Sequence, residues 1–164
     1  MMNFSWEKGN HKIYGWINYA FTQSKIRTGR PGDPHRSTWV NYGQEQEHAA
    51  KFIFAYIFKR HGISARFQLN TSFPYTPIVD ADDTLTPGRY MPIYYDGIPN
   101  QRNFPVFHRL DLRYTFKTMK KWGFISFYIG FINIYNSQAI NGENFDYDKP
   151  YAKGSNPTLE PANN

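Results

Sequence analysis

Charged side chains alternate with apolar ones in FHRLDLRYTF, residues 107–116. Arg109, Asp111 and Arg113 share one parity, and Arg66 occupies a similar place in an earlier alternating segment. Because alternate side chains of a strand point to the same face, the three charges of residues 107–116 are expected on one surface, with Arg66 on the same surface of a nearby strand. Such a row could bind an anionic ligand, or its opposite charges could pair across neighbouring strands and stabilise the sheet. Cross-strand pairing is the favoured hypothesis.

A second set of candidate binding residues is the tyrosine group Tyr90, Tyr94 and Tyr95 in RYMPIYYDG. Proline and glycine in this stretch indicate a loop. Tyrosine rings in a loop can stack on a ligand, since each ring offers an apolar face and a polar edge. Packing within the loop explains the same residues equally well, and both hypotheses stay open.

The residue types that carry metal or covalent chemistry are sparse. The chain has no cysteine, and its five histidines form no helical pair four residues apart, so we expect no metal site. His48 and His108 fall near the ends of predicted strands, where hydrogen bonding is the expected role. No G-x-S-x-G, H-E-x-x-H or phosphate-binding glycine loop occurs. We therefore predict no catalytic residues and no cofactor, and the protein is not expected to be an enzyme.

The composition is unusually aromatic for a hydrophilic chain. Aromatic residues make up 19% of the 164 residues, although the mean hydropathy is −0.67. Aromatic side chains favour strands and also concentrate at membrane interfaces. The net charge of +6 is spread along the chain, which is typical of a solvated polar surface. No apolar run of about 18 residues is present, so no transmembrane helix is expected. The first residues lack the pattern of a secretory signal.

Hydrophobic periodicity predicts an all-β protein. Five strands are expected, at residues 12–26, 48–59, 63–72, 107–116 and 124–135, with a possible sixth at residues 144–154. Residues 48–59 are apolar on all sides and follow QEQE, so a helix is the alternative there. Their β-branched and aromatic residues favour a strand. A bulge near Asn133 would explain the change of parity in the fifth strand.

The connections between the predicted strands alternate in length. Residues 60–62 and 118–123 are short connections, whereas residues 27–47 and 73–106 are long ones. Compact soluble domains rarely contain structureless loops of this length. Transmembrane β-barrels combine short periplasmic turns with long outer loops. The apolar face from Leu110 to Phe116 would then contact lipid, and the charged face would line a polar lumen.

Several segments together resemble the C-terminal part of the barrel of TonB-dependent outer-membrane receptors. They are NTSFPYTP, FPVFHRLDLRYTFK, the turn ending in KKWG, and FYIGFINIYN, with YGWINYAFTQSKI and EHAAKFIFAYIFKRHGISARF before them. FHRLDLRYTF followed by INIYN is the most specific combination. The resemblance covers nearly the whole chain and implies that residues 1–164 are an antiparallel up-and-down meander forming part of a transmembrane β-barrel.

The resemblance also implies a function and a set of partners. Receptors of this family take up scarce ligands such as siderophores, haem, cobalamin or glycans across the outer membrane of Gram-negative cells. The implied partners are outer-membrane lipid, the rest of the barrel, a plug domain, the TonB complex through the missing N-terminal part, and a small-molecule ligand of unknown identity. No nucleic-acid partner is implied. Arg66, Arg109, Asp111 and Arg113 would contact the plug or the ligand from the lumen.

The sequence departs from the family pattern in ways that indicate a fragment. The signal peptide, TonB-contacting segment, plug domain and final strand of the family are not found. About five to six strands cannot close a barrel, because the smallest membrane barrels have about eight. We therefore expect a sheet that does not close alone.

Two other hypotheses remain. The chain could be a soluble β-rich module that binds glycans or single-stranded nucleic acid through basic and aromatic side chains. It could also be a structural membrane protein in which several copies contribute strands to one barrel, which requires an even number of strands. Alternating long and short connections argue against the first alternative, and the family resemblance argues against the second.

Overall fold

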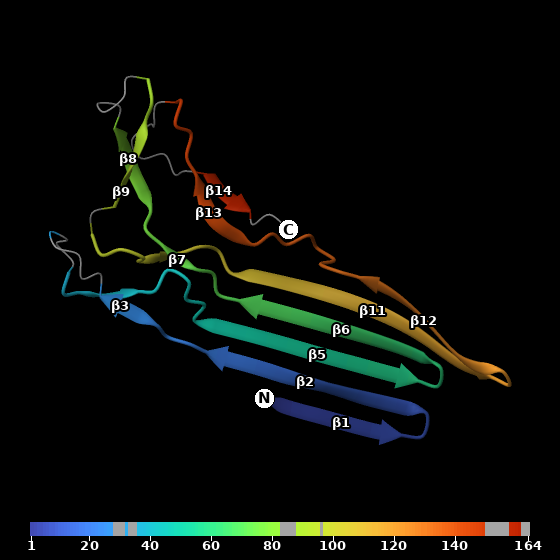
Figure 1. Ribbon diagram of the computed structural model, residues 1–164. Helices are drawn as coiled ribbons and strands as arrows, with labels where there is room; N and C mark the ends of the chain where they lie inside the picture. Colours follow the sequence, from blue (N-terminus) through green and yellow to red (C-terminus); the bar gives the residue numbers. More distant parts are fainter. Residues whose placement is uncertain (28–31, 33–35, 83–87, 96, 150–157, 162–164) are drawn as a thin grey trace. The chain divides into compact units, whose positions relative to one another are not determined.

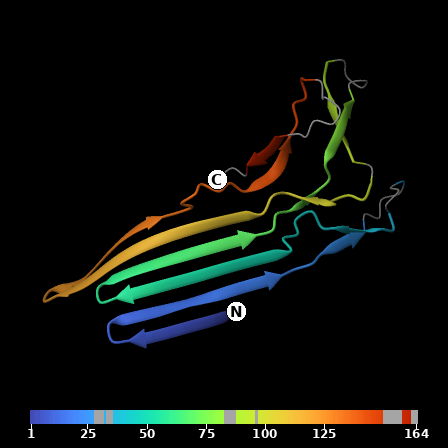
Figure 2. The same cartoon turned by 180° about the vertical axis from the view of Figure 1, so that it is seen from behind.

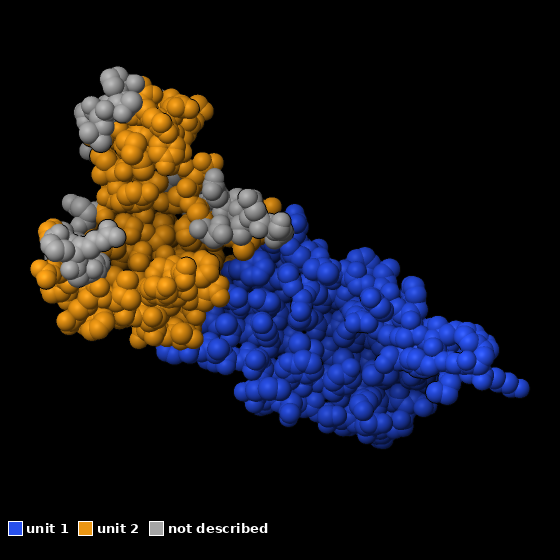
Figure 3. Space-filling model, viewed as in Figure 1, with its two compact units in different colours: residues 1–21, 48–70, 107–137 blue, residues 22–47, 71–106, 138–164 orange. Residues whose placement is uncertain are grey.

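The computed structural model describes residues 1–27, 32, 36–82, 88–95, 97–149 and 158–161. The chain divides into two units, coloured separately in Figure 3. The first unit comprises residues 1–21, 48–70 and 107–137. The second comprises residues 22–47, 71–106 and 138–164.

The first unit is a six-stranded antiparallel sheet with neighbouring strands in chain order (Figure 1). Its strands are β1 (Met2–Lys8), β2 (His11–Phe21), β5 (His48–Phe58), β6 (His61–Asn70), β11 (Phe107–Lys120) and β12 (Gly123–Phe131). The prediction of an all-β up-and-down meander is therefore confirmed. β1 and β12 occupy the two edges and do not pair with each other, so the sheet is open.

Three tight turns join these strands in pairs. Lys8 pairs with His11, Phe58 with His61, and Lys120 with Gly123, which leaves two residues in each turn. Two-residue hairpin turns favour positive φ, and Gly9 (φ 59°) and Lys59 (φ 54°) adopt it. Figures 1 and 2 show all three turns at the same end of the sheet.

Some of the predicted strand bounds were wrong. The first predicted strand ends at Phe21, and a separate short strand follows. The sixth strand of the sheet is β1, which the sequence analysis did not identify. Residues 144–154 do not supply it; of these, residues 150–154 lie outside the described residues. Beyond the end of β12, Asn133 has φ 53°, and the N–H of Ile134 donates to the carbonyl of Leu110 at 3.0 Å, one residue out of the β11–β12 register. This offset agrees with the change of parity predicted near Asn133. No helix in the described part of the chain is long and apolar enough to cross a membrane.

The described part of the second unit consists of short two-stranded antiparallel pairs, in residues 22–47, 71–106 and 138–164. They are β3 (Lys25–Arg27) with β4 (Trp39–Asn41), β7 (Pro74–Tyr75) with β10 (Arg102–Asn103), β8 (Ile78–Asp82) with β9 (Met91–Tyr94), and β13 (Ile140–Asn144) with β14 (Thr158–Pro161). Val40, Ile78 and Phe104 are buried here. The Phe104 ring stacks on Tyr75, with ring centres 4.2 Å apart. The predicted long connections therefore have local structure and are not simple loops.

Candidate functional site

Three of the four predicted charged residues form one cluster on the polar face of the sheet. Arg66 in β6 and Asp111 in β11 are cross-strand partners, and Arg66 Nε donates to Asp111 Oδ2 at 2.8 Å. Arg109 Nε lies 3.2 Å from Asp111 Oδ1, an ion pair without hydrogen-bond geometry. The favoured prediction of cross-strand charge pairing is confirmed for Arg66 and Asp111, whereas Arg109 pairs with Asp111 within its own strand.

Asp111 also connects β11 to the segment after β12. The backbone N–H of Asn133 donates to Asp111 Oδ1 at 2.9 Å, and the N–H of Ile134 donates to the carbonyl of Leu110 at 3.0 Å. The Asn133 side chain bridges both backbone groups of Ser137 at 2.9 Å. Asparagine suits the positive φ found here, because it tolerates that conformation better than most residues.

Arg113, the fourth predicted residue, does not join the cluster. Its guanidinium lies over the ring of Tyr128, 4.1 Å from the ring centre. No acidic side chain of the described residues forms an ion pair with it. A shallow hollow beside it is lined by Arg60, Lys117 and Ser126, among others, and by no carboxylate. This end of the polar face therefore has the charge and the hydroxyl donors to attract an anion.

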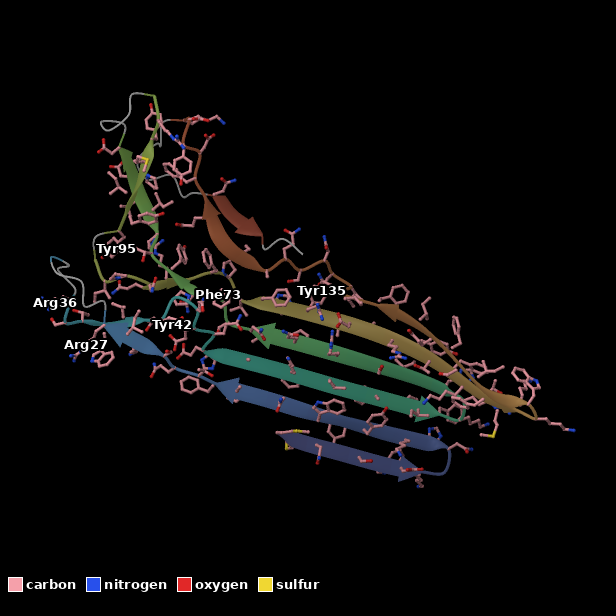
Figure 4. The ribbon with its side chains drawn as sticks, viewed as in Figure 1. Arg27, Arg36, Tyr42, Phe73, Tyr95 and Tyr135 are labelled. Carbon is pink, nitrogen blue, oxygen red and sulfur yellow. The ribbon has the colours of Figure 1, made fainter. Side chains whose placement is uncertain are left out.

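The structure does not bring the three candidate tyrosines together. Tyr90 precedes β9, and its N–H donates to the carbonyl of Tyr147 at 2.8 Å. Tyr94 ends β9, and Tyr95, labelled in Figure 4, has its ring against Gly97. No ring contact between these tyrosines occurs in the described residues. Tyr94 and Tyr95 are exposed, so a ligand-stacking role stays a prediction for those two.

The opposite face of the sheet is apolar and exposed. The register places apolar residues from all six strands on this face, including Phe52, Phe54, Leu112, Phe127 and Ile129. Each of these five is at least 37% exposed. A smaller set of apolar residues shares the charged face: Trp16, Ile53, Ile57 and Phe124. Ala55 is the only buried apolar side chain that the described residues place in the sheet. The apolar face therefore lacks the packing that an apolar sheet surface needs in water.

Histidine–tyrosine pairs border this apolar face at both ends. At the tight-turn end, His11 Nδ1 lies 2.8 Å from the Tyr56 hydroxyl, and His61 Nδ1 lies 2.6 Å from that of Tyr114. At the other end, the corresponding distances are 2.8 Å for His48 with Tyr19 and 3.0 Å for His108 with Tyr135 (Figure 4). These four pairs are called the His–Tyr rims below.

The rims have a repeated geometry. His11 faces Phe58 directly across the strands, His61 faces Phe116, and His48 faces Phe21. In each case the tyrosine lies two residues before that phenylalanine on the same strand, so it is the diagonal cross-strand neighbour of the histidine. The hydrogen bonding predicted for His48 and His108 is confirmed, but their tyrosine partners were not predicted. The sequence pattern that could have indicated these pairs is the alternation within β2, β5, β6 and β11. The paired histidines and tyrosines of these strands have the same parity as the apolar residues and therefore lie on the same face.

Comparison with family models, curated proteins and solved structures finds no match to this chain. Its function must therefore be inferred from the two faces of the sheet. One face offers aliphatic and phenyl groups between two polar rims. The other offers paired charges at one end and unpaired cations at the other.

Proposed function

We propose that this chain is a wall segment of an outer-membrane TonB-dependent receptor, which takes up a scarce ligand such as a siderophore, haem, cobalamin or glycan. The observation that carries the proposal is the exposed apolar face bordered by the two His–Tyr rims. Lipid chains would cover the apolar band, and the rims would lie at the two membrane–water interfaces. Aromatic residues with one polar edge favour that location.

The length of the strands supports this interpretation. β2 and β5 have 11 residues each. At about 3.3 Å per residue such a strand reaches roughly 36 Å, and tilted by about 40° it crosses roughly 28 Å. Membrane barrels have an apolar band about 25 Å tall. The length of β2 and β5 is thus sufficient to cross the apolar band of a bilayer.

The charges on the polar face support a position of that face toward the barrel lumen. Charged residues are expensive in lipid but are accommodated in a polar barrel interior. Asp111 pairs with Arg66 and Arg109 and accepts a backbone N–H, so two arginines share one carboxylate and the cluster keeps an excess positive charge. Arg113 and Lys117 remain available to a plug domain or to an anionic ligand passing along the face.

The two open edges support a segment of a larger barrel. Unpaired backbone groups at β1 and β12 would each cost several kcal/mol in lipid, so further strands must pair with both. The resemblance of FHRLDLRYTF and INIYN to the receptor family supplies the identity of that larger barrel. The localisation that follows is the outer membrane of a Gram-negative cell.

Cell fractionation tests the proposal. An antibody against residues 88–95 would be used to blot fractions of the source cells, with and without boiling of each sample. We expect an outer-membrane band several times larger than 19.3 kDa that changes mobility on boiling. A soluble band at 19.3 kDa would reject the proposal and favour the soluble binding module.

A further inference from the structure

The tight-turn end of the sheet gathers exposed basic residues. Lys8 precedes the first turn, Lys59 and Arg60 form the second, and Lys120 and Lys121 belong to the third. All five are exposed, and none forms an ion pair with an acidic side chain of the described residues. Glu7, the acidic residue beside them, is paired with Lys12 at 3.4 Å.

Large apolar side chains accompany these cations. Met119 and Trp122 flank Lys120 and Lys121 and are 77% and 78% exposed. Trp6, two residues before Lys8, is 50% exposed and lies on the apolar face. Lysine next to exposed tryptophan is the combination that a bilayer interface accommodates, since the ring enters the interface while the ammonium group reaches phosphate.

The position of the third turn fits this combination. Phe116 is the cross-strand partner of His61, and β11 continues four residues further to Lys120. At about 3.3 Å per residue, the hairpin extends roughly 13 Å beyond the level of the second turn. Met119, Trp122 and the two lysines therefore lie beyond the His–Tyr rim, on the side away from the apolar band.

We propose that the tight-turn end of the sheet binds the phosphate headgroups of an anionic phospholipid bilayer through Lys8, Lys59, Arg60, Lys120 and Lys121. This inference rests on the proposed lipid contact of the apolar face. Basic residues close to a bilayer surface each add to its affinity for acidic lipids. Short turns of membrane barrels face the periplasm, so the bound lipids belong to the leaflet on that side.

Vesicle flotation of the full refolded chain tests the inference. One set of vesicles is pure phosphatidylcholine, and the other contains about one third phosphatidylglycerol. We expect at least about tenfold tighter binding to the anionic vesicles, weakening as salt rises. The triple variant Lys59→Gln, Lys120→Gln, Lys121→Gln should lose most of that preference and keep its binding to phosphatidylcholine.

The matched control is Lys25→Gln, Arg36→Gln, Arg89→Gln, which removes the same charge from exposed positions in the second unit. The control should keep the preference; an equal loss would overturn the inference, because net charge alone would then explain it. Equal binding of the unmodified chain to both kinds of vesicle would also overturn the inference. It would not contradict the proposed contact of the apolar face with lipid. Flotation with neither vesicle would overturn the inference, whereas cell fractionation tests the proposed function separately, because the open edges of the isolated sheet disfavour insertion into lipid.

Tryptophan fluorescence tests the inference independently of the charge variants. Replacing Trp6, Trp16 and Trp39 by Phe leaves Trp122 as the sole tryptophan. Brominated lipid should quench its fluorescence more strongly in anionic than in neutral vesicles. Stronger competition by a single-stranded oligonucleotide than by an equal ionic strength of chloride would assign the turns to nucleic acid and overturn the inference.

Discussion

The carboxylate of Asp111 accepts the backbone N–H of Asn133 at 2.9 Å. This contact joins the two segments FHRLDLRYTF and INIYN, which lie on different sides of the β11–β12 hairpin. The same carboxylate holds Arg66 of the next strand. One side chain therefore contacts both the neighbouring strand β6 and the segment that follows β12.

Replacing Asp111 by Asn should destabilise the sheet. Asn removes the only negative charge that pairs with Arg66 and Arg109 among the described residues, and we expect a loss of about 1–3 kcal/mol in the free energy of unfolding. Urea unfolding in lipid vesicles measures it. The control is Arg113→Gln, which loses a cation–π contact of about 0.5–1 kcal/mol. Equal losses in the two variants would show that the cluster has no special role.

A double-mutant cycle should isolate the pair Arg66 and Asp111. Because the Arg66 side chain is 48% exposed, solvent screens part of the interaction. We expect a coupling energy between Arg66→Gln and Asp111→Asn of about 0.5–1 kcal/mol, which is below that of a buried pair. A coupling of zero would mean that the ion pair contributes nothing and that the Asn133 contact alone explains the effect of Asp111→Asn.

The His–Tyr rims should stabilise the sheet mainly in lipid. Tyr56→Phe removes the partner of His11, and Tyr114→Phe removes that of His61. In a bilayer each should cost about 0.5–1.5 kcal/mol of unfolding free energy, because water competes less well for the vacated histidine nitrogen. Tyr14→Phe, on the polar face, is the control and should be neutral. The rim hypothesis fails if all three variants unfold alike in vesicles.

Gly15 and Gly62 offer a matched test of packing on the sheet. A Cβ at Gly15 would collide with the carbonyl oxygen of Ile53 and the ring of Phe4, whereas at Gly62 the nearest atom is 3.7 Å away. We expect Gly15→Ala to lower the unfolding free energy by about 1–3 kcal/mol. Gly62→Ala should be neutral or stabilising by up to about 1 kcal/mol. Similar effects at both positions would contradict the close approach of Phe4 to β2.

Glu143 should make the second unit more stable in acid than at neutral pH. Burial raises the pKa of its carboxyl, although the N–H of Ile78 at 3.3 Å and the charge of Arg102 act in the opposite direction. Folding therefore favours the protonated form. This stabilisation is complete below the unfolded pKa near 4.5 and is lost as the pH rises through the higher folded pKa.

Hydrogen exchange of the Ile78 amide across this pH range measures the effect. After correction for intrinsic rates, protection should fall as the pH rises, and Glu143→Gln should remove that dependence and raise protection at neutral pH. Glu7→Gln, at an exposed site in the other unit, should leave it unchanged. Protection of Ile78 that increases with pH in the unmodified protein would show that the sign is wrong.

The strands were predictable from sequence because their signal is local. Alternation in residues 107–116 placed Leu110 and Leu112 on one face and Arg109 and Asp111 on the other, and the register agrees. The same period of two is present in MNFSWEK, but this segment was not recognised as β1. Its seven residues are all exposed and pair with one neighbour only, so their fit into the sheet depends on β2.

The strand-rich fold, the order of five strands of the meander, two of its short turns and the main residue types of each face follow from local patterns in the sequence. Which side chains meet follows only from the folded sheet, because a contact between strands depends on their register. Arg66 reaches Asp111, whereas Arg113 reaches Tyr128. The diagonal meeting of His11 with Tyr56 likewise needs the alignment of β2 and β5, which the periodicity of either strand alone does not specify.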